Sequence, residues 1–349
     1  MKKLTLRRMD DAHFHPRDDD EITEMVLEHL FVSGFARAVP IFNFKIPIET
    51  AWQIDKERKR FQRLGCKIEI VWSIMLTKNT TAQSIREAYA AGARIIKWMP
   101  ADCFSTNSGI GVRWGEIREK YPCFLEAEKL GMSVKVHLEK SEFDVTGNPT
   151  TPPVWREFLP LSEFDVLVRA FPGLVFSIEH ISTRRVLRYV LHEAPSNVFG
   201  GITAHHLFRT FFDIYDGSHI PKGDEWCMPI YKYPEDREAL VLAATGGSDK
   251  VHYCSDKAPH RWKDPLSPPA GVYTGLTDIC LLAELFEEHD ALRELDNFMS
   301  ASWARSVGLP FNTGTVTLVK EEWTAPEEVN GVRIFFGGKK LKWKVGSIS

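Results

Sequence analysis

The stretch that decides the fold is TAQSIREAYAAGARIIKWM, residues 81–99. Its first part has apolar residues at helical spacing and closes on Gly92, as helices often do. Its second part, ARIIKWM at 93–99, is a short apolar, β-branched run typical of a buried strand. A helix that leads directly into a buried strand indicates an α/β protein with a parallel sheet.

The same alternation continues on both sides of this stretch. Amphipathic segments such as residues 21–35, 119–132 and 235–247 lie between short apolar runs. Eight strands are expected, at residues 4–13, 36–43, 67–75, 93–99, 133–139, 174–181, 198–204 and 251–256. Eight alternations of strand and helix predict a (β/α)8 TIM barrel, of the α/β class. We expect the barrel to span residues 1–311, with a small β-containing C-terminal extension at 312–349 packed on it.

The composition is that of a soluble globular protein. The chain has 349 residues, which suit one α/β barrel or two ordinary domains. Apolar residues make up 44% and charged residues 26%, so disorder is not expected. The net charge is −3 and no long basic run is present, so nucleic acid is not an expected partner.

The chain is expected to stay in the cytoplasm. Its first residues, MKKLTLRRMDDAHFH, are interrupted by charge before any apolar run long enough for a signal peptide. No stretch approaches the length that crosses a membrane, so a membrane is not an expected partner. The six cysteines contain no C-x-x-C pair, which favours free thiols. A bound metal would therefore be held by histidine and carboxylate.

Polar side chains stand at the C-terminal ends of the expected strands, where barrel enzymes carry their chemistry. His13, His15 and Arg17 are spaced by two, so they share one face if this stretch is extended. Five further ionisable or polar residues stand on or just after other strands: Asn43, Lys97, His137, His180 and Asp256. Together they predict a metal site at one mouth of the barrel.

Each of these residues also has an ordinary interpretation. A lone His-x-His is often a polar loop, and Lys97 could be a lysine that extends to the surface. His137 and His180 could be hydrogen-bonded core histidines, and Asp256 could cap a helix. Their coincidence at strand ends favours the metal site. His205 and His206 follow the seventh strand, and we expect a structural or supporting role for them.

These residues resemble the amidohydrolase superfamily, and in finer detail the shorter dihydroorotases of bacteria, fungi and plants. The matching motifs extend from about residue 10 to the C-terminal GVRIFFGGKKLKWKV. They are DAHFHPRDDDE, FNFKIPIET, IIKWMPADCFSTNSGIGV, KVHLE, FSIEHIST, ITAHHL, CMPIYK and YCSDKAPH. The resemblance implies reversible, zinc-dependent cyclisation of N-carbamoyl-L-aspartate to L-dihydroorotate and water, in de novo pyrimidine biosynthesis.

The resemblance also implies a ligand set for two Zn²⁺ ions per subunit. His13, His15 and Asp256 would hold the first zinc, and His137 and His180 the second. Lys97, N6-carboxylated, would bridge the two ions together with a hydroxide. Carboxylation needs a neutral amine, which burial favours. Asp256 would also act as the catalytic residue that moves the proton.

Further residues match the family's substrate-binding groups. Arg17, Asn43 and His260 would anchor the free carboxylate of the substrate, for which a guanidinium is well suited. Backbone groups would frame the ring, and two hydroxyls on a loop would close over it. The backbone groups belong to Met228, Ala258, Ala270 and Gly271, and the hydroxyls to Ser105 and Thr106. Family members are often dimers, so a homodimer is expected.

The chain departs from the family pattern at three places. The second strand is followed by FNFKIP, where the family usually has Pro-Asn-Leu and two prolines. Ser105 and Thr106 stand one residue further from Lys97 than the pattern has them, and the segment after His260 is shorter and lacks the usual cysteines.

Two alternatives stay open. One is another cyclic amidohydrolase, such as a hydantoinase or an allantoinase. Arg17, Asn43 and His260 argue against it, because a neutral ring offers them no carboxylate. The other is a non-catalytic paralogue, since a fold does not fix a function. Loss of a metal ligand would indicate such a paralogue, and none is missing.

Overall fold

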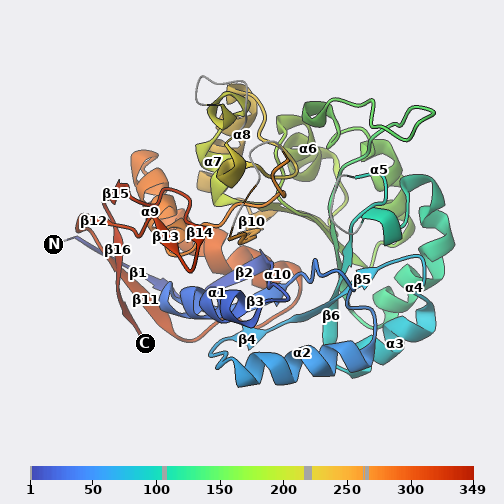
Figure 1. The fold of residues 1–349 in the computed structure, drawn as a ribbon, viewed down its shortest axis with the longest axis horizontal. Coiled ribbons are helices and arrows are strands. Elements are labelled where there is room, and N and C mark those ends of the chain that lie inside the picture. Colours follow the sequence, from blue (N-terminus) through green and yellow to red (C-terminus); the bar gives the residue numbers. More distant parts are fainter. Residues whose placement is uncertain (1, 104–107, 216–221, 262, 264–266) are drawn as a thin grey trace.

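The protein is a (β/α)8 barrel, as the alternation predicts (Figure 1). This computed structural model describes residues 2–103, 108–215, 222–261, 263 and 267–349. Nine described strands occupy the eight strand positions of the barrel, because β4 and β5 together occupy the third position. They are β2 (Met9–Phe14), β3 (Phe35–Pro40), β4 (Glu69–Ile70), β5 (Trp72–Leu76), β6 (Ala93–Trp98), β7 (Ser133–Val136), β8 (Val175–Ile178), β9 (Val198–Ile202) and β10 (Val251–Tyr253).

Every pairing between two barrel strands is parallel. One sheet has the order β10-β9-β8-β7-β6-β5 and another the order β2-β3-β4. The amide of Val71, between β4 and β5, donates to the carbonyl oxygen of Ala38 on β3 at 3.0 Å and so joins the two sheets. A parallel bridge between Phe14 and Lys257 closes the barrel between β2 and the segment after β10.

The helices lie around the outside of the barrel (Figure 1). Several of them begin at typical capping residues: Thr50 before α2 accepts from the Gln53 amide, and Thr81 before α3 accepts from the Ser84 amide. The α-helices are α1 (Asp20–Val32), α2 (Ala51–Arg63), α3 (Ala82–Ala90), α4 (Tyr121–Lys129), α5 (Leu161–Ala170), α6 (Arg184–Arg188), α7 (Ala204–Phe208), α8 (Pro234–Thr245), α9 (Asp278–Glu288) and α10 (Ser302–Ser306). No helix among the described residues is both long and apolar enough to span a bilayer.

The strand expected at residues 4–13 is two separate strands, which corrects the prediction. Only β2 enters the barrel, whereas β1 (Lys3–Arg7) pairs antiparallel with β11 (Thr315–Val319) outside it. The amide of Arg8, between them, donates to the carbonyl oxygen of Gly314 at 2.8 Å instead of to a barrel strand. The strand expected at 67–75 is likewise divided at Val71 into β4 and β5.

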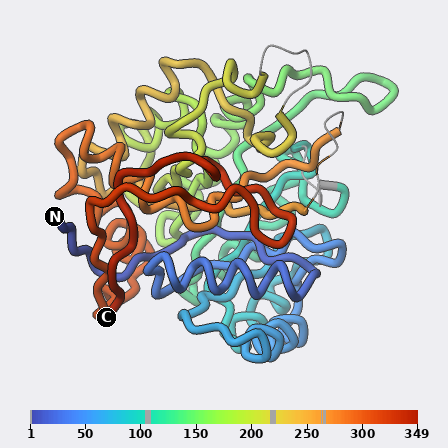
Figure 2. The backbone as a smooth tube through the Cα atoms, turned by 60° about the vertical axis from the view of Figure 1, so that its left-hand side comes forward, coloured from blue at the N-terminus to red at the C-terminus, as the bar shows by residue number. Residues whose placement is uncertain are grey.

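The C-terminal residues form short strands that pack beside the N-terminal segment. Figure 2 shows the red C-terminal chain beside the blue start of the chain. A three-stranded sheet has the order β1-β11-β16, so both ends of the chain contribute to it. The remaining strands are β12 (Trp323–Thr324), β13 (Glu328–Val329), β14 (Val332–Arg333), β15 (Lys340–Leu341) and β16 (Lys344–Ile348). The division into a barrel at 1–311 and an extension at 312–349 stays a prediction.

The barrel interior changes from apolar to polar along the strands. Near their N-terminal ends, Val71 before β5 and Ile95 on β6 belong to one buried apolar cluster, which also includes Trp303 of α10. Further along, Lys97 on β6, Lys135 on β7 and Ser177 on β8 are in register and form a buried polar row. Because in-register residues of parallel strands share a face, this row lies directly beneath the C-terminal mouth.

Candidate active site

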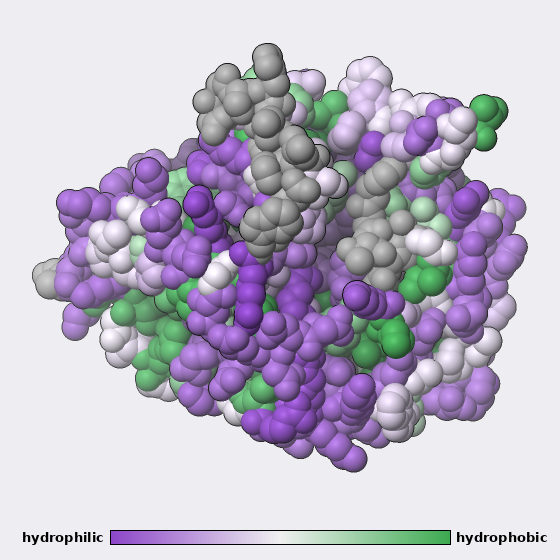
Figure 3. Space-filling model, in the orientation of Figure 1, coloured by the Kyte–Doolittle hydropathy of each residue, from purple (hydrophilic) through white to green (hydrophobic). Residues whose placement is uncertain are grey.

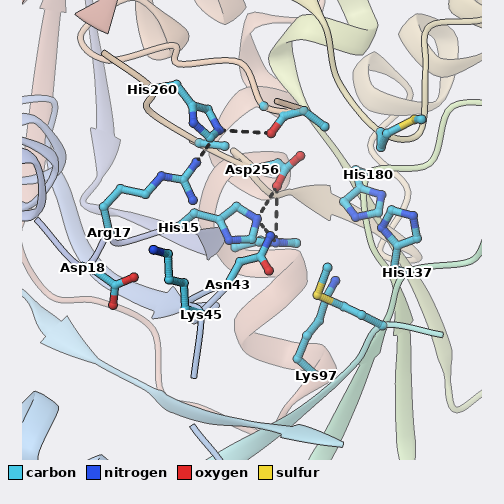
Figure 4. A pocket seen from close by; sticks show the side chains of 16 residues that line it. His15, Arg17, Asp18, Asn43, Lys45, Lys97, His137, His180, Asp256 and His260 are labelled. Atoms are coloured by element: carbon cyan, nitrogen blue, oxygen red, sulfur yellow. Dashed lines mark hydrogen bonds and ion pairs between the residues drawn. The ribbon is translucent and has the colours of Figure 1, made fainter. Parts of the chain in front are cut away.

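A cavity of about 420 Å³ opens at the C-terminal ends of the barrel strands. Figure 3 shows a hollow in this face, with hydrophilic residues at its rim. In Figure 4, His15 and Asp256 lie in the middle, His137 and His180 lie together on the right, and Arg17 and His260 lie together on the left. The lining residues are His13, His15, Arg17, Asp18, Asn43, Lys45, Lys97, Met99, His137, His180, Met228, Asp256, Ala258, His260, Ala270 and Gly271.

Three of the predicted ligands converge on one point. Nε2 of His13 lies 3.2 Å from Nε2 of His15, and Oδ1 of Asp256 lies 2.9 Å from the His15 nitrogen and 3.4 Å from the His13 nitrogen. All three residues are buried. Two imidazole nitrogens and one carboxylate oxygen this close together form a suitable donor set for a divalent cation such as Zn²⁺.

Outer hydrogen bonds select which imidazole nitrogens face that point. Nδ1 of His13 lies 3.1 Å from a carboxylate oxygen of Glu179, and Nδ1 of His15 lies 2.8 Å from the carbonyl oxygen of Ile41. Carboxylate and carbonyl oxygens only accept, so both Nδ1 atoms carry the proton. The lone pairs of both Nε2 atoms are therefore directed at the convergence point.

His137 and His180 lie next to this group. Their ring centroids are 4.7 Å apart, and the His180 ring is 5.5 Å from that of His13. Nε2 of His137 donates to Glu139 at 2.7 Å, which leaves the lone pair on Nδ1 as the one that can bind a metal ion. Nδ1 of His180 is buried and has no hydrogen-bond partner among the described residues. The four imidazoles thus form a continuous row across the mouth.

Left-handed backbone turns two of these residues into the cavity. His180 has φ 46° and Asp256 has φ 49°, values that non-glycine residues adopt rarely. In a regular strand His180 would point away from the face of its neighbour Glu179. With the left-handed conformation, the side chains of His180 and Asp256 both point into the cavity. Such strained backbone is common at functional sites.

Lys97 extends from β6 into the base of the cavity (Figure 4). Its Nζ is buried and has no hydrogen-bond partner among the described residues. Burial lowers the pKa of Lys97 to about 8, against the opposing charges of Glu179 and Asp256. A buried amine without a partner loses its proton readily, and the neutral amine is the form that can be carboxylated. Lys97 therefore fits a bridging role between two metal ions.

The surroundings of His13 and Asp256 favour a neutral imidazole beside an ionised carboxylate. Burial, followed by the charge of Lys97, lowers the pKa of His13 to about 3. Burial raises the pKa of Asp256, but its close contacts with His15 and His13 bring that pKa below its ordinary value. Neutral imidazole and ionised carboxylate are the forms that bind metal.

A cationic group lies on the other side of the cavity. Nη2 of Arg17 is 3.0 Å from Nε2 of His260, and Nε of Arg17 donates to the carbonyl oxygen of Pro259 at 2.7 Å. Asn43 follows β3 and lines the same cavity. The structure therefore brings the three predicted carboxylate anchors to the same cavity.

The remaining predicted residues divide into two groups. Met228, Ala258, Ala270 and Gly271 line the cavity near the anchors. The predicted loop hydroxyls, Ser105 and Thr106, lie outside the described residues.

Comparison with known proteins assigns the chain to a family. The chain is 36% identical over 352 residues to a dihydroorotase of Variovorax paradoxus, covering 98% of both chains. It is 35% identical over 358 residues to a dihydroorotase of Shewanella frigidimarina, covering 99% of both. The chain belongs to the dihydroorotase family. Dihydroorotases are metal-dependent amidohydrolases that act on cyclic amides, as the motifs predict.

A solved structure agrees with this assignment. The dihydroorotase of Saccharomyces cerevisiae, in complex with 5-fluoroorotic acid, superposes with a TM-score of 0.90 at 27% identity and covers 99% of both chains. No protein-family model matches the chain.

Three buried polar residues of this dihydroorotase-family chain went unnoticed in the sequence. Glu139 and Glu179 orient His137 and His13, and Lys135 donates to Glu179 at 2.9 Å. A usable signal was present. Each carboxylate stands within two residues of a predicted ligand, just after the end of a buried strand.

A second cluster of possible metal ligands lies outside the cavity lining. His205, His206 and Cys227 are close together and buried. His206 uses both ring nitrogens in contacts with Thr203 at 2.8 Å and Pro229 at 3.0 Å. Burial raises the pKa of the Cys227 thiol to about 12. This set favours a packed, neutral cluster, consistent with the supporting role expected for the two histidines.

Proposed function

We propose that this chain interconverts N-carbamoyl-L-aspartate and L-dihydroorotate at the cavity around His13, His15 and Asp256. The observation that carries the proposal is the two-sided arrangement of the cavity. A converging set of metal donors occupies one side, and the Arg17 guanidinium with His260 beside it occupies the other. A ring amide and a free carboxylate on one small substrate match these two sides.

The metal centre is proposed to hold two zinc ions. His13, His15 and Asp256 would hold one ion and His137 and His180 the other, with N6-carboxylated Lys97 between them. The buried, unpaired Nζ of Lys97 and Nδ1 of His180 support this assignment. When bound, such a pair of ions polarises the amide carbonyl and makes a nucleophile available near neutral pH.

Asp256 is proposed to move the proton. In ring opening its carboxylate takes a proton from the attacking water and delivers it to the ring nitrogen that leaves. Ring closure reverses these steps. The contact with His15, together with the left-handed backbone, supports a carboxylate held in place for this transfer.

Arg17, Asn43 and His260 are proposed to bind the free carboxylate of the substrate. A guanidinium forms short, paired hydrogen bonds with a carboxylate, and partial burial strengthens them. The contact of Arg17 Nε with Pro259 fixes the direction of the guanidinium group. Backbone groups of Met228, Ala258, Ala270 and Gly271 would frame the ring, with Ser105 and Thr106 closing over it.

The test is a substrate panel on protein of known metal content. Ring opening of L-dihydroorotate is measured beside hydantoin and allantoin. We expect turnover of dihydroorotate well above that of either neutral ring. Preferred turnover of a neutral ring would identify a different cyclic amidohydrolase. A protein that binds metal but opens none of the three rings would be a non-catalytic paralogue.

We also propose a homodimer in the cytoplasm. Six free cysteines suit a reducing compartment. Sedimentation of the purified protein tests the dimer directly.

A further inference from the structure

A buried ion pair lies directly beneath the proposed metal centre. Lys135 on β7 and Ser177 on β8 are in register with Lys97 on β6, and Glu179 follows Ser177 by two residues. The side chains of Lys135 and Glu179 are 1% and 0% exposed. The proposed function assigns neither of them a role.

Glu179 is the centre of this group. Its Oε1 accepts from Lys135 Nζ at 2.9 Å and from Ser177 Oγ at 2.6 Å. Its Oε2 accepts from Nδ1 of His13 at 3.1 Å. The carboxylate therefore joins a lysine from one strand to an imidazole from another, with a serine of its own strand as the third donor.

The bond to His13 has a consequence for metal binding. It keeps the proton on Nδ1 and directs the Nε2 lone pair towards His15 and Asp256. It also fixes the plane of the ring, since the imidazole can meet Glu179 in only one orientation. An imidazole held in this way binds metal more tightly than a freely rotating one.

Glu179 depends on Lys135 for its place in the interior. A lone buried carboxylate is strongly disfavoured unless an opposite charge and hydrogen bonds compensate it. The ammonium of Lys135 supplies that charge and lies 5.8 Å from the Trp303 ring on its other side. Among the described residues, Lys135 has no hydrogen bond to any of the proposed metal ligands.

We propose that Lys135 and Glu179 are a positioning pair, in which Lys135 fixes Glu179 and Glu179 fixes the ring and tautomer of His13. The pair thereby sets how tightly the chain holds the metal ion at His13, His15 and Asp256. This inference rests on the metal centre of the proposed function, but it concerns metal affinity rather than turnover.

The experiment measures Co²⁺ binding to metal-free protein in bicarbonate buffer, by titration and by the visible absorption of the bound ion. The variants are Glu179→Gln, Lys135→Met and the double variant. We expect Glu179→Gln to weaken one of the two Co²⁺ sites roughly 10- to 100-fold and to change its spectrum. Lys135→Met should weaken the same site about 10-fold, which is the size of effect expected for a residue that supports a metal ligand from outside. Because Lys135 acts through Glu179, the double variant should be no weaker than Glu179→Gln.

Glu139→Gln is the matched control, because Glu139 contacts His137 rather than His13. It should weaken the other Co²⁺ site and leave the first unchanged. Thermal unfolding of the metal-free variants separates stability from metal binding. Folded variants that keep wild-type Co²⁺ affinity and spectrum, or additive effects of the two substitutions, would overturn the proposal.

Ser177→Ala provides a second test if the variants that remove the charge of Glu179 or Lys135 do not fold. It removes one hydrogen bond to Oε1 and leaves both charges in place. We expect it to weaken the same Co²⁺ site by a factor of about 2 to 5, the effect of one modest hydrogen bond. An unchanged site would contradict the proposal. The outcome does not depend on dihydroorotate turnover, so a failure here is distinct from a failure of the proposed function.

Discussion

His15 and Asp256 stand 241 positions apart in the chain, and Nε2 of one lies 2.9 Å from Oδ1 of the other. We expect Asp256→Asn to lower kcat with L-dihydroorotate by roughly 10²- to 10⁴-fold, the usual contribution of a general acid-base group. Most of the metal should remain, because the amide oxygen of asparagine can still act as a ligand. Steady-state kinetics and metal analysis check both points.

Asp18→Asn is the control for this substitution. Asp18 is an exposed carboxylate that lines the same cavity but does not contact the imidazoles in any described hydrogen bond or ion pair. Its removal should change kcat little. Near-normal turnover by Asp256→Asn would refute the proton-transfer role.

Arg17→Met should lower kcat/KM for dihydroorotate by roughly 10- to 100-fold, because a charge-assisted hydrogen bond contributes about 1.5 to 3 kcal/mol. The loss should appear largely as a higher KM, with unchanged metal content. Lys45→Met is the comparison, since Lys45 lines the same cavity but is exposed. A smaller effect is expected there. A change in Arg17→Met confined to thermal stability would contradict the anchor role.

Lys97→Arg should prevent the two metal ions from binding in their normal arrangement, because a guanidinium stays charged and cannot be carboxylated. We expect fewer than two zinc ions per chain and a large loss of activity. Metal analysis after dialysis in bicarbonate buffer measures the stoichiometry, with Lys45→Arg as the control. Two tightly bound zinc ions in Lys97→Arg would count against the bridge.

His29 gives the fold a predictable dependence on pH. It is buried, with Nδ1 2.7 Å from the Tyr273 hydroxyl oxygen, and burial lowers its pKa from 6.5 to about 4. As the pH falls below 6.5, the unfolded chain binds this proton first. The contribution of His29 to stability is therefore complete above pH 6.5 and falls progressively as the pH drops to about 4, by at most roughly 3 kcal/mol.

Urea unfolding of the metal-free protein between pH 7 and pH 4.5 measures this dependence. His29→Gln should make the decline shallower. His289→Gln is the control, because His289 is exposed at the end of α9. Parallel curves for His29→Gln and the wild type would rule out this contribution.

The periodicity of apolar residues predicted the barrel but not the role of its first segment. Residues 4–13 read as one strand because β1 and β2 are both rich in apolar residues and only Arg8 separates them. What separates them is tertiary: Arg8 bonds to Gly314, more than 300 residues away. No local pattern carries that information.

The site was predictable where strand ends carry unusual residue types, as with Lys97 and His137. It was less predictable where a neighbour decides the geometry. His180 and Asp256 reach the cavity through left-handed backbone, which alternation along a strand does not anticipate. Glu179 and Lys135 matter through contacts across three strands, and each alone looks like an ordinary charged residue.

The pairing of β1 with β11 also constrains when the protein can finish folding. β1 is made before its partner β11, which follows more than 300 residues later. At roughly 5 to 20 residues per second, the ribosome needs about 15 to 60 seconds to supply that partner. Throughout that interval the nascent chain already carries His13 and His15 but lacks a closed barrel. While β1 is unpaired during synthesis, other components of the cell must therefore protect it from wrong contacts.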